Sequence, residues 1–381
     1  MPYHKLASFH SFVLNLTMLA LFSGCKPATQ PKIPPKAIWY SFQDQKTELT
    51  GYKDAAGKVM VPAKFGLLTH SGVFRNIVPV MERSGEKYKN YYLLKNGKKA
   101  GLDSLYVWDA TLDCESEGKI RFRDKKTDQV GFFDRNGKIT IPAVYNDALP
   151  FYNGLAIVIR NAKRICWEGG ESTVQNPCEH WSWKGTVSII NTKNEIVIDS
   201  VKYGNPIDYY SLKIGGRLLD TNLYANFKGT NGRIYSFIDQ DKEFKWWFYK
   251  NYLADQSLNN LQATCFKELT VEQNFEKNGI RNLPKALFVK RYNAILQSKM
   301  RQIKQHLVEV NFFNEDMNNF IYTSKSFAEF YTDCGMANTQ KYPGYNVVTS
   351  FYTKDKRINY QENFHFIRTD GGYKLVGVAL K

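Results

Sequence analysis

Residues 131–145 read Gly131-Phe-Phe-Asp-Arg-Asn-Gly137-Lys-Ile-Thr-Ile-Pro142-Ala-Val-Tyr145, and this stretch decides the fold. A matching stretch, Gly51-Tyr-Lys-Asp-Ala-Ala-Gly57-Lys-Val-Met-Val-Pro62-Ala-Lys-Phe65, lies 80 residues earlier. In both, an aromatic strand end leads into Asp-x-x-Gly, a tight turn in which glycine supplies a positive φ. A lysine and an alternating apolar strand follow, and the strand closes at a proline, which cannot donate to a ladder. Each stretch therefore predicts a β-hairpin.

Two less regular copies follow the same logic. Residues 91–99 keep the aromatic strand and an Asn-Gly turn, and residues 186–198 place Asn194 where the glycine stood. Asparagine tolerates the left-handed conformation, so the turn is preserved. Regular hairpins across residues 41–225 predict a mainly β repeat domain of stacked β-hairpins that bury a shared face.

These residues resemble a known family. The stretch from Gly131 to Tyr145, followed by Pro150-Phe-Tyr-Asn-Gly154-Leu-Ala156-Ile-Val, is similar to the WG-repeat (KWG) family of bacteria. The resemblance implies an all-β repeat scaffold and at most binding, and it supplies no catalytic residues. The chain departs from the family in one respect, because Val130-Gly131 and Thr50-Gly51 stand where the tryptophan and glycine of the name belong.

The N-terminus has the order of a secretory signal. His4 and Lys5 precede a short apolar run, and Leu21-Phe-Ser-Gly-Cys25 resembles the lipobox of bacterial lipoproteins. This resemblance implies that residues 1–24 are a lipoprotein signal peptide and that Cys25 is lipidated. Residues 25–40 hold four prolines and read as a Pro-rich tether. We therefore expect an exported, membrane-anchored lipoprotein facing the periplasm or the cell surface; the alternative is an ordinary buried N-terminal segment.

A turn-rich insertion with tryptophans at its borders interrupts the hairpin pattern at residues 166–183. One interpretation is a binding loop closed by a disulfide between Cys166 and Cys178, since loops on rigid scaffolds concentrate function. The other is that the tryptophans cap the end of a β-core. The candidate binding residues are Trp167, His180, Trp181 and Trp183.

Residues 235–381 predict a second domain, of the α+β class with an antiparallel sheet. A helix begins near Pro284, with an apolar stripe at Phe288, Tyr292, Ile295, Leu296, Met300, Ile303 and Leu307. Its other face carries Lys285, Lys290, Arg291, Lys299, Arg301 and Lys304, which either is simply solvated or lies on anionic lipid. The strands that close the chain resemble the last hairpin of nuclear transport factor 2-like folds, which often enclose a pocket.

The 381-residue chain carries a net charge of +16, which favours anionic partners or reflects a lysine-rich surface. It has no nucleophile elbow, HExxH, phosphate-binding loop or dinucleotide fingerprint, and no Cys/His spacing typical of zinc. We expect a non-catalytic, lipid-anchored envelope protein without cofactor, which binds an envelope polysaccharide or protein, and nucleic acid is not an expected partner. The alternative is an enzyme or small-ligand binder with a pocket in residues 235–381.

Overall fold

The computed structural model describes residues 38–66, 71–173, 175–273 and 279–381, and residues 33–381 belong to one compact unit. The predicted signal peptide, Cys25 and the tether up to residue 37 lie outside the described residues. The end of the predicted tether is wrong, because Trp39 and Tyr40 belong to the first strand, where Trp39 packs against a buried core. Across the described ranges, no helix is both long enough and apolar enough to cross a membrane.

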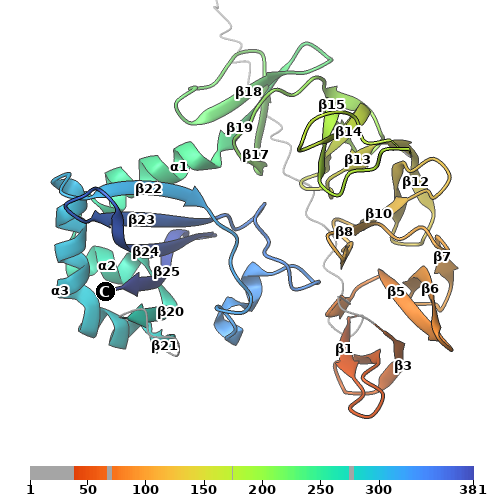
Figure 1. Cartoon of the computed structure of the whole chain (residues 1–381), viewed down its shortest axis with the longest axis horizontal. Coiled ribbons are helices and arrows are strands. Elements are labelled where there is room, and N and C mark those ends of the chain that lie inside the picture. The colour runs from red at the N-terminus through yellow and green to blue at the C-terminus, as the bar shows by residue number, and fades with distance from the viewer. Residues whose placement is uncertain (1–37, 67–70, 174, 274–278) are drawn as a thin grey trace, which may run out of the picture. The chain divides into compact units, whose positions relative to one another are not determined.

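β-Strands are the main regular structure of the described chain and form several mostly antiparallel sheets (Figure 1). Between residues 39 and 239 the strands fall into consecutive groups, each built around one tight turn. The groups are β1 (Trp39–Gln43), β2 (Thr50–Asp54) and β3 (Val59–Phe65); β5 (Ile77–Ser84), β6 (Lys87–Leu94) and β7 (Lys99–Ala100); β10 (Lys119–Arg123), β11 (Val130–Asp134) and β12 (Ile139–Tyr145); β14 (Leu155–Cys166), β15 (Trp181–Asn191) and β16 (Ile196–Ile198); β17 (Ile207–Gly215), β18 (Tyr224–Lys228) and β19 (Ile234–Asp239). Short strands between the groups are β4 (Val73–Phe74), β8 (Val107–Trp108), β9 (Thr111–Leu112) and β13 (Asp147–Ala148).

The predicted Asp-x-x-Gly turns have the same geometry in each copy. Asp54 Oδ1 accepts hydrogen bonds from the backbone N–H groups of Ala56 at 2.9 Å and Lys58 at 3.0 Å. Asp134 Oδ1 accepts the two equivalent bonds, both at 2.9 Å. The aspartate therefore organises the turn through its side chain, and the glycine three residues later takes a positive φ, +85° at Gly57 and +74° at Gly137.

The same backbone turn recurs at a shorter interval than the sequence alignment shows. It closes at Gly57, Gly97 and Gly137, which lie 40 residues apart, and again at Asn194 and Gly232. The interval from Gly137 to Asn194 is 57 residues, because the hairpin between them carries the predicted insertion. The 80-residue spacing is therefore two periods, and the hairpins continue to Asp239, beyond the predicted boundary at residue 225.

The glycine at the start of the motif is required by close packing. A Cβ on Gly131 would lie 2.5 Å from the carbonyl oxygen of Ile141 and 2.8 Å from the Phe122 ring. On Gly51 it would lie 2.6 Å from the carbonyl oxygen of Val61. Real Cβ atoms do not approach backbone oxygens this closely, so only glycine lets the neighbouring strand pass.

Each pair of consecutive groups shares a buried core, so that a hairpin is covered by the next one along the chain. Tyr52 and Tyr91 lie in the core of the first two groups, and Tyr92 and Phe133 in that of the second and third. Phe132 and Ile190 belong to the next core, and Ile189 and Phe237 to the last.

Helices appear only after residue 239 in the described chain, where Asp239 caps the first helix by accepting a bond from the Lys242 N–H at 2.9 Å. The elements are α1 (Gln240–Trp247), a π-helical turn (Phe248–Tyr252), α2 (Leu258–Thr264), β20 (Cys265–Gln273), β21 (Arg281–Pro284), α3 (Lys285–Lys304), β22 (Glu309–Asn314), a 3₁₀ helix (Lys325–Phe330), β23 (Gly344–Tyr352), β24 (Ile358–Thr369) and β25 (Gly372–Leu380). The strands form one six-stranded sheet in the order β21-β20-β25-β24-β23-β22.

This sheet is not wholly antiparallel as predicted, because β20 pairs with β25 in parallel. Turn signals specify only neighbours joined by a hairpin, whereas these two strands are joined through α3 and the other strands of the sheet. The core against the helices is filled with aromatic rings, including Phe244, Phe248, Phe288 and Phe366.

Helix α3 buries most of the predicted apolar stripe, but two of its members are exposed. Ile295 is 39% exposed, and Leu307, which is 68% exposed, lies beyond the end of the helix. Lys299 was predicted on the basic outer face, yet its Nζ lies 2.7 Å from Glu362, whose side chain is fully buried. This prediction is wrong because the aliphatic stem of lysine can follow the edge of a core and still reach a buried carboxylate.

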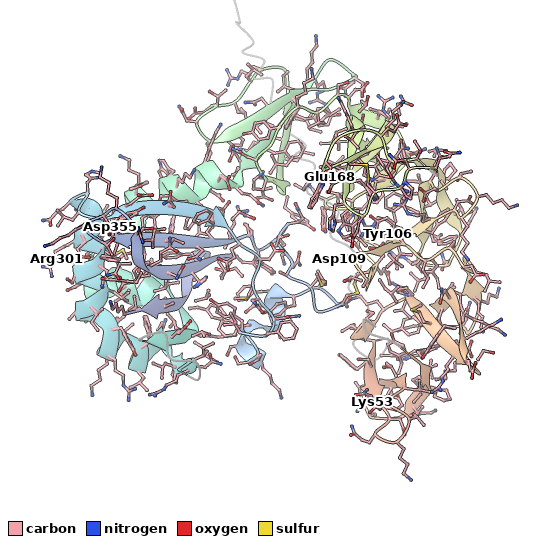
Figure 2. The ribbon with its side chains drawn as sticks, viewed as in Figure 1. Lys53, Tyr106, Asp109, Glu168, Arg301 and Asp355 are labelled. Carbon is pink, nitrogen blue, oxygen red and sulfur yellow. A yellow bond between two sulfur atoms is a disulfide. The ribbon has the colours of Figure 1, made fainter. Side chains whose placement is uncertain are left out.

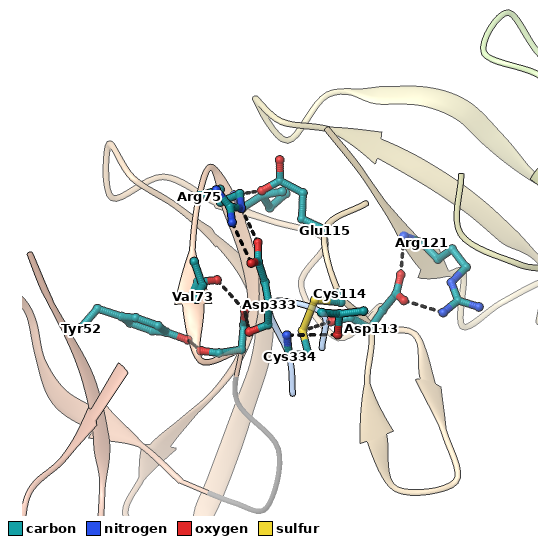
Figure 3. Close-up of a disulfide and its surroundings, with 12 residues drawn as sticks. Tyr52, Val73, Arg75, Asp113, Cys114, Glu115, Arg121, Asp333 and Cys334 are labelled. Carbon is teal, nitrogen blue, oxygen red and sulfur yellow. Dashed lines mark hydrogen bonds and ion pairs between the residues drawn. A yellow bond between two sulfur atoms is a disulfide. The ribbon is translucent and has the colours of Figure 1, made fainter. Parts of the chain in front are cut away.

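A disulfide joins Cys114, which follows β9, to Cys334, 220 residues later (Figure 3). Beside it, the Asp333 carbonyl oxygen accepts from the Val73 N–H at 3.1 Å, and the Asp333 carboxylate accepts two bonds from the Arg75 guanidinium, one of them at 2.9 Å. We call these three segments, residues 71–77, 113–115 and 332–336, the 114–334 junction. It attaches the C-terminal part of the chain to two successive hairpin groups.

Candidate functional site

The candidate residues lie on one long hairpin formed by β14 and β15. The two strands pair antiparallel from Leu155 opposite Asn191 to Cys166 opposite Trp181, with a bulge after Arg160. We call residues 163–184, beyond the bulge, the tip extension. Because side chains alternate along a strand, Trp181 and Trp183 share one face of the tip extension and Ser182 lies on the other.

The first face of the tip extension anchors the hairpin. The Arg164 guanidinium lies 4.5 Å from the ring centre of Trp181 and 5.0 Å from that of Trp183, and the two indoles meet edge to face at 4.9 Å. The Trp183 indole N–H donates to Asp147 at 3.0 Å, and Arg164 also pairs with Asp128. Trp181 and Trp183 are therefore partly buried against the preceding hairpin. For these two residues the contacts agree with the second interpretation of the sequence, in which tryptophans cap the end of a β-core.

Asp147 collects further bonds behind Trp183. It is buried, and its Oδ1 accepts from the Tyr106 hydroxyl at 2.8 Å and lies 3.4 Å from Arg123. Burial raises the pKa of Tyr106, which keeps this hydroxyl protonated and donating. The carboxylate thus connects the tip extension to Tyr106, which precedes β8, and to Arg123 at the end of β10.

The second face presents a flat aromatic surface to solvent. Trp167 is 70% exposed, and its ring stacks on His180 with the centroids 5.0 Å apart and an interplanar angle of 25°. The Trp167 indole N–H donates to Ser182 Oγ at 3.0 Å, and its backbone N–H donates to the His180 carbonyl oxygen at 3.1 Å. These bonds fix the indole in place, and we call Trp167 with His180 the aromatic platform.

A disulfide between Cys166 and Cys178, the pair that the sequence analysis selected, closes the loop that carries the platform. Within the loop, the N–H of Gly169 donates to the Cys166 carbonyl oxygen at 3.0 Å, and that of Cys166 donates to Gly170 at 3.0 Å. Gly169 and Gly170 both have positive φ, which lets the chain reverse directly after Trp167. The loop is therefore held by a covalent bond and by backbone bonds.

Two carboxylates flank the platform in sequence. Glu168 follows Trp167 and Glu179 precedes His180, and both are exposed (Figure 2 labels Glu168). In the described residues neither carboxylate has an ion-pair partner, whereas nearby Glu171 binds Lys163 at 2.8 Å. A planar aromatic surface whose two residues each have an exposed glutamate as chain neighbour suits a ligand that offers both an apolar face and hydroxyl or amine donors.

A second candidate place is a cavity beside β24, in the C-terminal part of the chain. It is lined by residues 315–318, 321–322, 344–345, 365–367 and 376, and at about 30 Å³ it has room for about two water molecules. His365 Nδ1 lies 3.9 Å from the Glu315 carboxylate, while burial lowers the pKa of this histidine and raises that of Asp316. In the described chain no group of His, Cys, Asp and Glu side chains has the arrangement of a metal site.

The model of the WG containing repeat family matches residues 131–163. This stretch is similar to the WG repeat. The match begins at Gly131, where the close packing described above requires glycine, and it ends where the tip extension begins. The aromatic platform therefore lies beyond the residues that match the family. A search among curated proteins found no match to the chain.

Sequence reasoning missed the residues that hold the tryptophans. Arg164 and Asp147 contact Trp181 and Trp183 on the first face of the tip extension, and neither belongs to a recognisable motif. A signal was present at Arg164, which precedes Cys166 by two residues and so lies on the Trp183 face of the strand pair. Cys25, the predicted lipidation site, lies outside the described residues.

Proposed function

We propose that this chain is a non-catalytic, exported and lipid-anchored envelope protein that binds a polysaccharide through the aromatic platform. The observation that carries the proposal is Trp167, an indole 70% exposed and yet fixed by stacking and by a hydrogen bond. A large apolar ring held rigidly in solvent loses little conformational entropy when a ligand covers it.

The proposal includes an architecture. Residues 39–239 form stacked hairpins of the WG type, and residues 240–381 form an α+β domain. The turn that recurs every 40 residues and the cores shared by consecutive hairpins support the first part. The aromatic core between the helices and the six-stranded sheet supports the second.

The chemistry around the platform favours a sugar polymer. The apolar C–H face of a pyranose ring packs on an indole, and its hydroxyl groups donate to carboxylates. Glu168 and Glu179 supply such acceptors, and because they are anionic they disfavour a strongly acidic polymer. A neutral or amine-bearing polysaccharide therefore fits the platform better than an acidic one, in spite of the net charge of +16 of the whole chain.

The test uses residues 33–381, which form one compact unit, and insoluble chitin, a neutral polymer of N-acetylglucosamine, as the probe in a sedimentation assay. We expect Trp167→Ala to weaken binding at least tenfold, as is usual for an aromatic hot spot. The matched control is Trp246→Ala, because Trp246 is 59% exposed on α1, far along the chain from the platform. Both variants should keep the wild-type melting temperature. Equal binding of the Trp167 variant and the wild type would refute the platform.

Export and anchoring rest on the lipobox pattern ending at Cys25 and are supported by the two disulfides, which persist in oxidising compartments. In bacteria expressing the full chain, Cys25→Ser should move the protein from the membrane fraction to the soluble fraction and abolish incorporation of labelled fatty acid. A Cys25→Ser protein that stays in the membrane fraction would count against the anchor but not against the platform.

A further inference from the structure

Helix α3 exposes two pairs of cations, one in its first half and one in its last turn. Its 20 residues contain six cations and no carboxylate, and the first acidic residue after Lys285 is Glu309. Lys299 turns inward to Glu362, which leaves Lys290, Arg291, Arg301 and Lys304 exposed. Arg301 is labelled in Figure 2.

These four side chains have no partner within the described ranges of the chain, where no ion pair or hydrogen bond involves any of them. Arg75, Arg121 and Arg368 each bind a carboxylate, whereas other arginines of the described chain, such as Arg83 and Arg217, have no ion pair. What distinguishes α3 is that four cations without a carboxylate partner lie on one helix. This concentration of positive charge favours an external anionic partner.

Apolar side chains are exposed beside these cations. Ile295 is 39% exposed, and Leu307, three residues after Lys304, is 68% exposed. Phe288, Leu296 and Met300 are buried on the opposite face, so α3 is fixed to the core and presents only its outer side. Cations around exposed Ile and Leu side chains match the boundary between lipid headgroups and acyl chains, whereas a soluble polyanion offers nothing to the apolar side chains.

We propose that the outer face of α3 docks on an anionic lipid bilayer through Lys290, Arg291, Arg301 and Lys304, with Ile295 and Leu307 entering the headgroup region. This goes beyond the proposed function, although the proposed lipid anchor would keep a bilayer close. The contact is a second attachment, and it would hold residues 240–381 at the membrane surface.

The experiment uses residues 33–381, which lack Cys25 and therefore any acyl chain, with vesicles of phosphatidylglycerol and phosphatidylcholine or of phosphatidylcholine alone. We expect binding only to the anionic vesicles, weakened by salt. Each basic residue near an anionic bilayer strengthens binding about fivefold, so Lys290→Glu/Arg301→Glu should weaken it by at least about 25-fold. The matched control, Lys58→Glu/Lys138→Glu, changes the net charge equally at two exposed turn positions and should bind like the wild type.

Three results would overturn the proposal: equal binding to neutral vesicles, equal loss in the control, or binding to soluble polyphosphate with none to vesicles. Chitin sedimentation of the same α3 variant reports on the platform separately, because this polymer is neutral. Trp167→Ala should in turn leave vesicle binding unchanged, so the failure of one proposal is distinguishable from the failure of the other.

Discussion

The disulfide between Cys114 and Cys334 should contribute more to stability than the one between Cys166 and Cys178, because it closes a much longer loop. The two bonds span 220 and 12 residues. If a disulfide acts by restricting the unfolded chain, the entropy removed is about 18 cal/mol/K for the long loop and about 9.5 cal/mol/K for the short one. At 25 °C this corresponds to about 5 kcal/mol and about 3 kcal/mol.

The assay is equilibrium urea unfolding of residues 33–381, followed by circular dichroism. Cys114→Ser/Cys334→Ser and Cys166→Ser/Cys178→Ser each remove one bond without leaving an unpaired thiol. We expect the first pair to lower the free energy of unfolding by about 2.6 kcal/mol more than the second. If the short-loop variant loses as much as the long-loop variant or more, restriction of the unfolded chain is not the source of the stability. If the Arg75–Asp333 ion pair is instead the main support of the 114–334 junction, Arg75→Ala should lower the free energy of unfolding more than the loss of the disulfide does.

Three further predictions concern single side chains. Trp183→Phe removes the indole N–H that Asp147 accepts and should lower the free energy of unfolding by about 1–3 kcal/mol, measured by urea unfolding against Trp167→Phe. Lys299→Met leaves the buried Glu362 carboxylate without its cation and should lower the free energy of unfolding by about 3–5 kcal/mol. A double variant that also carries Glu362→Met should recover much of this loss. Hydrogen bonds from Lys64, Lys99 and Tyr91 lower the pKa of Glu82 to about 2, below the value near 4.5 that it has when unfolded. Its contribution to stability is therefore full above about pH 5 and disappears towards pH 2, so wild type and Glu82→Gln should differ in unfolding at pH 7 and converge at pH 2.

The sequence predicts the hairpins well because their information is local. The turn at Asp134 needs only its own carboxylate, two backbone N–H groups and a glycine three residues on, and all of these lie within five residues. The 40-residue period was harder to see, because the copy at Gly97 lacks the aspartate and the copy at Asn194 lacks the glycine. Backbone bonds define the turn in both.

The remaining features depend on contacts between distant residues. No local pattern pairs Cys114 with Cys334, and no hairpin signal places β20 beside β25 in parallel. The inward turn of Lys299 depends on Glu362, which lies 63 residues later on another element. For the candidate site, the sequence pointed to the loop of residues 166–183 but did not separate Trp167, which is exposed, from Trp183, which is anchored.

The 114–334 junction also determines how the chain carries mechanical load. Consider a stretching force with one end attached before Cys114 and the other attached at the tip extension. This force is shared between two covalent paths that start at Cys114. One covalent path runs forward through residues 115–162, and the other crosses the disulfide to Cys334 and returns through the C-terminal part of the chain. A ligand held at Trp167 against a tether at the N-terminus would therefore strain two routes in parallel, and only the hairpins before Cys114 would bear the whole force.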